Sequence, residues 1–212
     1  MPDKNVLKLY GQVGSVEKSH EFNGEHFYKF MIHVKRNSGA VDVLPVIVSE
    51  KLLFNNDIDT GDYVYVAGQI RTKNSVSEDG KNRLLVFGYA TEIEQITEEE
   101  CDNNPNRNYV ELEGYVCKKP NYRETLSGRK ITDLLLASNR HYNKSDYVPS
   151  IAWGINAAFA KNFEVGTKVL VTGRFQSRSY KKKKEDGTYE ERVAYELSIS
   201  NLEIDWLEKE GA

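Results

Sequence analysis

One pattern occurs twice along this chain, and the repeat constrains the fold more than any other feature of the sequence. Four pairs of blocks keep their order at offsets of 103 to 105: residues 5–13 with 108–116, 30–36 with 134–140, 42–47 with 146–151, and 61–68 with 166–173. Chance does not keep four blocks in register, so the pattern indicates a tandem duplication. A chain of 212 residues is long enough for two small domains.

The repeat sets the expected domain boundaries. We expect an N-terminal domain over residues 1–95, a linker over 96–106 and a C-terminal domain over 107–207. The segment 96–106 is acidic, rich in Asn and without hydrophobic periodicity, as is common in linkers. Because it has only eleven residues, the two halves should stay close together.

Both halves show the alternation of apolar and polar residues that half-buried strands require. The clearest alternating sets are Leu7, Leu9, Gly11 and Val13; Phe30, Ile32 and Val34; Val64, Val66, Gly68 and Ile70; and Val169, Val171, Gly173 and Phe175. Turns are predicted at Asn23-Gly24, Asp79-Gly80, Ser127-Gly128 and Asp186-Gly187.

Each half has room for only one short helix after its third strand. The predicted helices cover about residues 49–55, with Ser49 as the N-cap, and about residues 156–162. Five strands with a helix between the third and the fourth is the order of the OB-fold, a small and partly open barrel. The predicted fold class is therefore all-β, with two tandem OB-fold five-stranded barrels.

The charge of the chain is unevenly distributed. The net charge is −3, but residues 1–105 carry 11 Lys and Arg against 17 Asp and Glu. Residues 106–202 carry 17 Lys and Arg against 11 Asp and Glu, since the last ten residues are acidic. Such asymmetry between halves is one indication of contact with nucleic acid, although small domains also differ by chance.

Several functional classes find no support in the sequence. No run of 18 apolar residues is present, and the N-terminal residues lead into no apolar stretch of signal-peptide length. Cys101 and Cys117 form neither a metal-binding spacing nor a disulfide framework, and the four histidines form no ligand spacing. Phosphate-binding, hydrolase and metalloprotease motifs are missing. We expect a cytoplasmic protein that is not an enzyme and has no cofactor.

The second half carries a more specific set of motifs: Thr125–Gly128, Leu136–Arg140, Asp146-Tyr147 through to Trp153, and Gly173-Arg174-Phe175-Gln176-Ser177-Arg178-Ser179-Tyr180. With these motifs the chain closely resembles the bacterial single-stranded DNA-binding protein family. The resemblance covers residues 108–207, and the first half resembles the same family only in its framework.

The resemblance implies four aromatic positions on the DNA face: Tyr142, Tyr147, Trp153 and Tyr180. An exposed ring can stack on any base, and for proteins of this class stacking is worth roughly 1–3 kcal/mol per base. The aligned positions of the first half carry no ring; they are Ser38, Val43, Ser49 and Ser75. A single Trp or Tyr is often a core residue, so the interpretation depends on all four positions together.

Polar residues are predicted to accompany the rings. In the strand from Lys168 to Tyr180, side chains alternate, so Arg174, Gln176, Arg178 and Tyr180 should share one surface. The further candidates for DNA binding are Arg129, Lys130, Arg140, Lys181, Lys182, Lys183 and Lys184. A purely structural role for Arg140 stays open because it aligns with Arg36, and the four lysines can equally form a solvated loop.

The leading hypothesis is sequence-tolerant binding and protection of single-stranded DNA in replication, recombination or repair. The alternative is a structural or partner-binding OB-fold module of a replication or primosome-type assembly, a role that the acidic first half favours. RNA is not excluded as a ligand. The resemblance implies assemblies of four OB-folds, hence a homodimer of this chain. The acidic tail with Pro-Phe, by which the family recruits repair enzymes, has no counterpart in residues 203–212.

Overall fold

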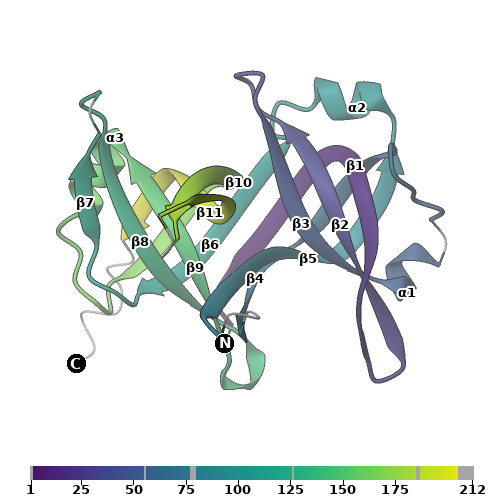
Figure 1. Cartoon of the computed structure of the whole chain (residues 1–212), viewed down its shortest axis with the longest axis horizontal. Helices are drawn as coiled ribbons and strands as arrows, with labels where there is room; N and C mark the ends of the chain where they lie inside the picture. The colour runs from purple at the N-terminus through teal and green to yellow at the C-terminus, as the bar shows by residue number, and fades with distance from the viewer. Residues whose placement is uncertain (1, 55, 77–79, 126, 185–186, 205–212) are drawn as a thin grey trace.

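In a computed structural model of the chain, two β-rich halves lie side by side (Figure 1). The structure describes residues 2–204 except residues 55, 77–79, 126 and 185–186. The predicted turn residues Asp79 and Asp186 therefore lie outside the described residues, as do Trp206 and Leu207, which we expected to close the last strand. All described strands belong to a single eleven-stranded sheet that curls into two barrels.

The first half is a closed barrel. Its described strands are β1 (Asn5–Phe22), β2 (Glu25–Lys35), β3 (Val41–Ser49), β4 (Tyr63–Val76) and β5 (Asn82–Ile96). Strand β1 pairs with both β2 and β4, β3 pairs with β2 and β5, and β4 pairs with β5. This cycle of pairings leaves no free edge within the barrel and confirms the predicted OB topology.

The second half repeats the same cycle of pairings. Its described strands are β6 (Asn108–Val116), β7 (Asn121–Glu124), β8 (Lys130–Asn139), β9 (Ser145–Trp153), β10 (Lys168–Lys183) and β11 (Tyr189–Ile204). Strands β6, β8, β9, β11 and β10 close the barrel in that order, and β7 adds to β8. The continuous β1 of the first half corresponds to two strands here, β6 and β7, because Pro120 between them has no N–H for a ladder.

The helices differ in part from those predicted. Helix α1 (Glu50–Leu53) begins after Ser49, whose Oγ accepts a hydrogen bond from the N–H of Lys51 at 3.1 Å, as predicted. Helix α3 (Gly154–Ala160) begins two residues earlier than expected. No helix was predicted in the linker segment 96–106. Helix α2 (Glu98–Asn103) lies there, started by a capping box between Thr97 and Glu100.

The two barrels are joined through their first strands. Strands β1 and β6 run antiparallel, with Leu7 opposite Val110. Two equivalent asparagines bracket this junction, and each bonds the backbone of its own half's fourth strand. The Asn5 side chain donates to Ile70 O at 2.8 Å and accepts from Ile70 N at 2.9 Å. The Asn108 side chain bonds Phe175 in the same two ways, at 2.6 and 2.9 Å.

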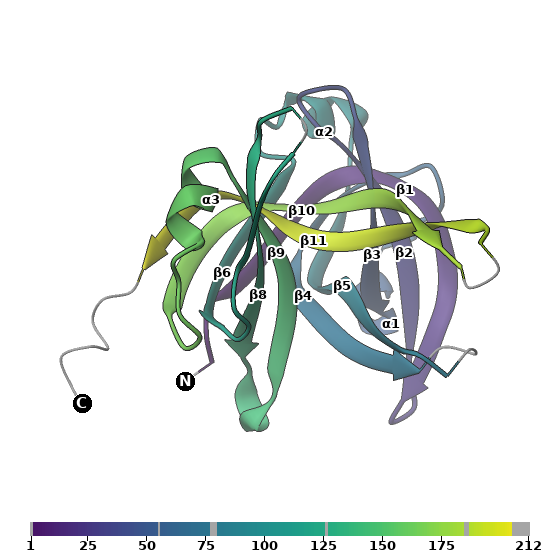
Figure 2. The ribbon, with the colours of Figure 1, turned by 60° about the vertical axis from the view of Figure 1, so that its left-hand side comes forward.

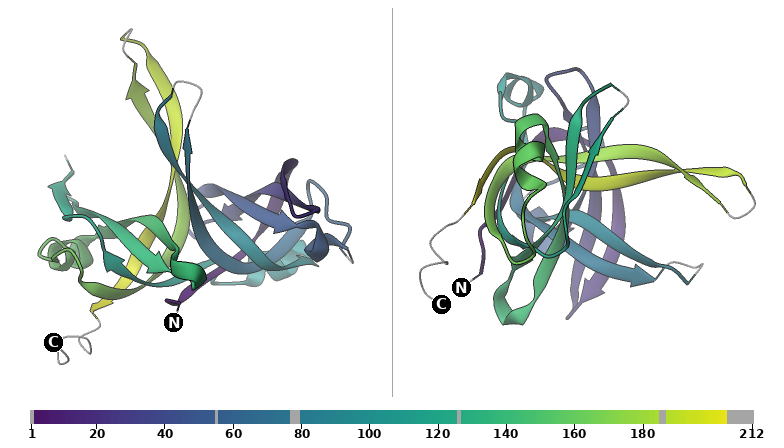
Figure 3. Two further views of the ribbon diagram at one scale, coloured as in Figure 1. Left: turned by 90° about the horizontal axis from the view of Figure 1, so that it is seen from below. Right: turned by 90° about the vertical axis from the view of Figure 1, so that its left-hand side faces the viewer.

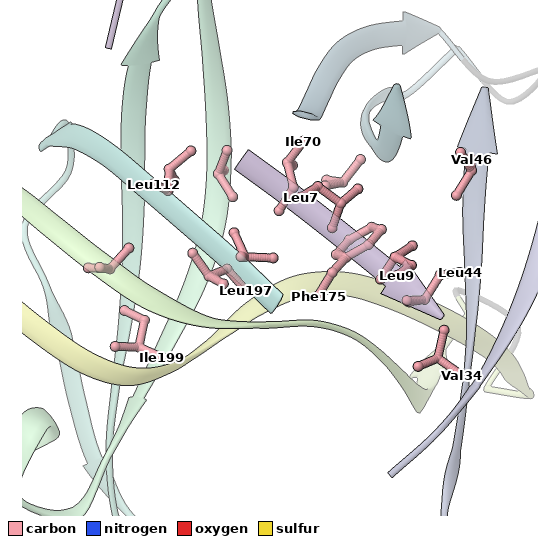
Figure 4. Close-up of a cluster of buried hydrophobic side chains, with 14 of the residues drawn as sticks. Leu7, Leu9, Val34, Leu44, Val46, Ile70, Leu112, Phe175, Leu197 and Ile199 are labelled. Atoms are coloured by element: carbon pink, nitrogen blue, oxygen red, sulfur yellow. The ribbon is translucent and has the colours of Figure 1, made fainter. Parts of the chain in front are cut away.

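A single hydrophobic cluster runs through the junction. Phe175 and Leu197 of the second half are fully buried in the same cluster as Leu7 and Leu9 of the first half (Figure 4). Apolar burial of this kind is the main stabilising contribution to a fold. The two halves therefore share one core, and the alternating residues of β1 that we predicted to be buried form part of it.

Each barrel extends one long hairpin over the other barrel. The β10–β11 hairpin passes across the first half (Figure 2) and rises beside the β4–β5 hairpin (Figure 3, left). Each hairpin contains a β-bulge, where the register shifts next to a glycine. The shifts lie between Ala67 and Gly68 of β4 and between Thr172 and Gly173 of β10. A Cβ on either glycine would overlap a backbone carbonyl oxygen, that of Tyr89 or Ser198, so only glycine fits there.

Two buried aspartates hold these hairpins against the opposite barrel. Asp42 of β3 accepts a hydrogen bond from Ser177 N of β10 at 2.8 Å, and it pairs with Arg36. Asp146 of β9 accepts from Thr72 N of β4 at 2.7 Å. Both aspartates are fully buried, as equivalent members of the duplicated frame.

The Asp146 carboxylate also accepts from Arg71 Nη1 at 3.0 Å and lies 3.2 Å from Arg140 Nε. Replacing it by alanine leaves two cations without their partner and an N–H unpaired, and such a loss costs about 3 kcal/mol or more. We expect Asp146→Ala to lower the free energy of unfolding in urea by that amount.

The matched control is Asp102→Ala, which removes an exposed ion pair with Lys35. Exposed pairs contribute below about 1 kcal/mol, so this variant should stay close to the wild type. Equal losses in both variants would show that the buried aspartate does not hold the two halves together.

Candidate nucleic-acid interface

Trp153 lies where β9 ends and α3 begins. Residues before it alternate between the core and the surface, so that Val148 and Ala152 are buried while Tyr147 and Trp153 are exposed. The Trp153 ring is 36% exposed, and its Nε1 donates to Ser198 Oγ at 3.2 Å. The hydrogen bond fixes the plane of a ring that is still accessible to a ligand.

Arg174 lies next to this ring. Ser198, which holds Trp153, is the cross-strand partner of Arg174 in the β10–β11 ladder. Partial burial lowers the pKa of Arg174, and the nearby charge of Arg36 lowers it further. The Asp42 carboxylate, which pairs with Arg36, acts on Arg174 in the opposite direction, so Arg174 is the group here that favours an anionic ligand.

Gln176 and Arg178 are held by a carboxylate that the sequence did not reveal as their partner. The Gln176 side chain is buried and donates to Glu196 at 2.8 Å. Arg178 binds both oxygens of Glu196, at 3.1 and 3.2 Å, and this pairing raises the pKa of Arg178. The buried Gln176 therefore helps to position Glu196, and through it Arg178, which is exposed.

Tyr180 extends the same face along the β10–β11 hairpin. Its ring is 38% exposed, and the Arg178 guanidinium lies 5.9 Å from the ring centroid. The four lysines that follow are all exposed: Lys181, Lys182, Lys183 and Lys184. Three of them are in ladder positions opposite Glu191, Glu190 and Tyr189, so carboxylates partly balance their charge.

Tyr142 and Tyr147 lie on the neighbouring loop and strand. Tyr142 is 94% exposed and has a left-handed backbone, with φ of 63°. The turn around it is closed by a hydrogen bond from Arg140 N to Lys144 O at 2.7 Å. The Tyr147 side chain is exposed, and its backbone N–H donates to Thr72 Oγ1 of the first half at 2.9 Å. Both rings are therefore presented outward by well-bonded backbone.

The remaining candidate cations fall into two groups. Arg129 and Lys130 are exposed where β7 turns into β8, and Arg129 approaches Trp153 because Ile131, two residues on, is opposite Trp153. Arg140 instead pairs with the buried Asp146, as Arg36 pairs with Asp42. This contact supports the structural role for Arg140 that its alignment with Arg36 had left open.

The structure places seven of the fourteen candidates in two grooves. The other seven line neither groove: Lys130, Arg140, Tyr142, Tyr147, Lys181, Lys183 and Lys184. The first, here called the tryptophan groove, is lined by Arg129, Trp153, Arg174, Gln176 and Arg178 among others. The second, called the central groove, lies between the two hairpins and is lined by Arg178, Tyr180 and Lys182 among others. Arg178 lines both grooves, so the two adjoin at this residue.

Sequence reasoning missed the contribution of the first half. Lys35, Arg36, Asn37 and Ser38 line the tryptophan groove although they precede the predicted DNA-binding domain by some seventy residues. The alignment of Arg36 with Arg140 was the available sequence signal for these residues. That alignment predicts a role in the barrel framework and not in DNA binding. Contact across the two halves depends on the β1–β6 junction, which no local pattern shows.

In the described part of the chain, no three His, Cys, Asp or Glu side chains are placed to hold a metal ion. None of the helices that the structure describes has the length and apolar character needed to cross a membrane.

Comparison with known proteins agrees with this geometry. The model of the single-strand binding protein family matches residues 107–205. A single-stranded DNA-binding protein of Clostridium tetani is 31% identical over 113 residues, which cover 50% of this chain and 75% of that protein.

Two solved structures of a Thermus aquaticus single-stranded DNA binding protein share the fold of nearly the whole chain. The wild-type structure has a TM-score of 0.74 at 18% identity and covers 97% of this chain and 94% of that one. A deletion mutant of the same protein has a TM-score of 0.71 at 19% identity, over 96% and 95% of the two chains. The Clostridium relative, the family match and the duplicated barrels agree that this chain belongs to the single-strand binding protein family.

Proposed function

We propose that the protein binds single-stranded DNA with little sequence preference, through exposed rings and cations of the second half, and so protects exposed strand. The observation that carries the proposal is the tryptophan groove, where a fixed indole lies in one lining with Arg129, Arg174 and Arg178. Rings supply stacking that tolerates any base, and guanidinium groups bind phosphates. A protein that coats exposed single-stranded DNA of this kind acts in the cytoplasm, at the nucleoid.

The binding of strand requires no bond to be made or broken, so the protein acts as a binder and not as an enzyme. Phosphate contacts contribute a salt-dependent part of the affinity, and ring stacking contributes a part that salt affects little. Duplex DNA keeps its bases paired and stacked, so rings in the groove cannot reach them. The proposed ligand is therefore unpaired strand, and matched RNA and duplex oligonucleotides test the choice.

Base stacking on the rings should contribute most of the affinity for short single-stranded DNA. We expect Trp153→Ala and Tyr180→Ala each to weaken binding of an oligo-dT of about 35 nucleotides by roughly 5- to 100-fold, the equivalent of one lost stacking contact. Fluorescence anisotropy of labelled oligo-dT measures the change.

Phe54→Ala is the matched control, because Phe54 is 88% exposed in the first half and lines neither groove. It should bind as the wild type does, and circular dichroism should show all three variants folded. If both ring variants bind like the control, the stacking assignment is wrong.

Glu196 is expected to limit the affinity by neutralising Arg178. In Glu196→Gln the amide still accepts a hydrogen bond, but Arg178 is free to bind a phosphate. We expect tighter oligo-dT binding and a plot of log affinity against log salt that is steeper by about 0.7, the value for one added phosphate contact.

Glu164→Gln removes the same charge at an exposed position outside both grooves and serves as the control. Weaker binding by Glu196→Gln than by this control would contradict the proposed role of Arg178.

We also propose that two copies of the chain associate, which brings four barrels together. The outer face of strands β4, β1 and β6 carries tyrosines that the barrels do not cover: Tyr10 is opposite Tyr65, with ring centroids 4.8 Å apart, and Tyr109 is opposite Lys8. Burial raises the pKa of both Tyr65 and Tyr109. A broad face rich in tyrosine suits a two-fold interface.

Light scattering should give a mass of twice 24.3 kDa for the wild type. Tyr65→Arg places a cation in the middle of this face and should shift the mass toward that of one chain. A wild-type mass of one chain at micromolar concentration would overturn the proposed homodimer.

A further inference from the structure

The central groove has a lining whose charge differs from that of the chain as a whole. Among the described residues, eight Lys and Arg line it against two carboxylates, Asp133 and Glu196, although the chain has a net charge of −3. Asp133 and Glu196 pair with Arg123 and Arg178, and carboxylates outside the lining, Glu17 and Glu190, pair with Lys29 and Arg192. The lining itself carries an excess of positive charge, as a binding site for a polyanion requires.

The acidic first half supplies half of these cations. It contributes four of its eleven, Lys29, Lys73, Lys81 and Arg83, and none of its acidic residues within the described ranges lines the groove. Cations of both halves therefore face the same groove, which favours an anionic ligand.

The duplication shows that Lys73 is the counterpart of Arg178. The two residues are 105 positions apart, the offset at which the fourth strands of the two halves match. In the second half Gln176 is opposite Glu196, and Glu196 binds Arg178. At the corresponding place of the first half Arg71 is opposite Phe87, which carries no charge. The carboxylate that restrains Arg178 therefore has no equivalent beside Lys73.

The groove also has room for bases. Its lining includes Met31, Pro45 and Ile47 of strands β2 and β3, and apolar residues of both hairpins, among them Leu85 and Val193. Leu85 and Val193 are each close to half exposed. A lining that mixes cations with apolar residues suits a chain that has charged phosphates on one side and apolar base faces on the other.

We infer that the central groove binds the phosphate backbone of the strand that leaves the tryptophan groove, with Lys29 and Lys73 of the first half as contacts. The inference rests on the proposed function and assigns the first half a direct part in it. Arg178 lines both grooves, so a strand that leaves the tryptophan groove past this residue reaches the lining of the central groove. The second half then supplies the rings, and both halves supply the cations.

The test compares a double variant, Lys29→Ala with Lys73→Ala, against a control of equal charge, Lys118→Ala with Lys119→Ala. Both control lysines are exposed and line neither groove. Lys29 forms an exposed pair with Glu17, at 2.9 Å, so its loss should cost little stability. Thermal melts verify that both variants fold, and Lys73→Arg should retain wild-type binding.

For oligo-dT of about 35 nucleotides, the groove variant should lose the salt dependence of two phosphate contacts. The slope of log affinity against log salt should become shallower by about 1.4 relative to the control, with roughly 10- to 25-fold weaker binding near 0.1 M salt. If the groove variant matches the control while Trp153→Ala weakens binding, this inference is wrong and the proposed function stands. If Trp153→Ala also binds normally, the proposed function itself fails.

Discussion

The antiparallel pairing of β1 with β6 is the contact on which the rest of the structure depends. The N-terminal part of each first strand precedes the residues that pair with β2 or β8, and the β1–β6 pairing satisfies the backbone groups on that side of both strands at once. It also fixes the angle at which the long hairpins cross onto the opposite barrel. The aspartates that receive those hairpins, Asp42 and Asp146, are buried only because the halves meet in this way.

The two halves use one frame for different tasks. The second half has kept Trp153 and Tyr180, whereas the aligned serine and valine positions of the first half serve the framework: Ser49 caps a helix, and Val43 N donates to Ser177 of the other half at 3.1 Å. Duplicated folds can diverge in this way because residues on the outer face of a barrel strand do not contribute to its core. The affinity for single-stranded DNA and the stability of the two joined barrels can then change independently.

Local patterns were sufficient for the strands, the duplication and the barrel topology. They also placed the turn at Asn23-Gly24, where both residues have positive φ. Helix α2 was missed although the sequence contains its capping box of Thr97 and Glu100, because a segment that is acidic and has no hydrophobic periodicity was interpreted as the linker alone. The pairing of Gln176 and Arg178 with Glu196 was beyond prediction, since it depends on the register of β10 with β11 after a bulge. Contacts between halves require the tertiary arrangement.

The most direct measurement of the central claim is the fluorescence of Trp153 during titration with oligo-dT. The chain has two tryptophans, so Trp206→Phe leaves Trp153 as the single reporter. At about 50 mM salt we expect strong quenching as a base stacks on the indole, a weaker affinity near 300 mM salt, and no quenching with duplex DNA. Oligo-dT binding without any change in Trp153 emission would contradict the account, because the strand would then lie elsewhere.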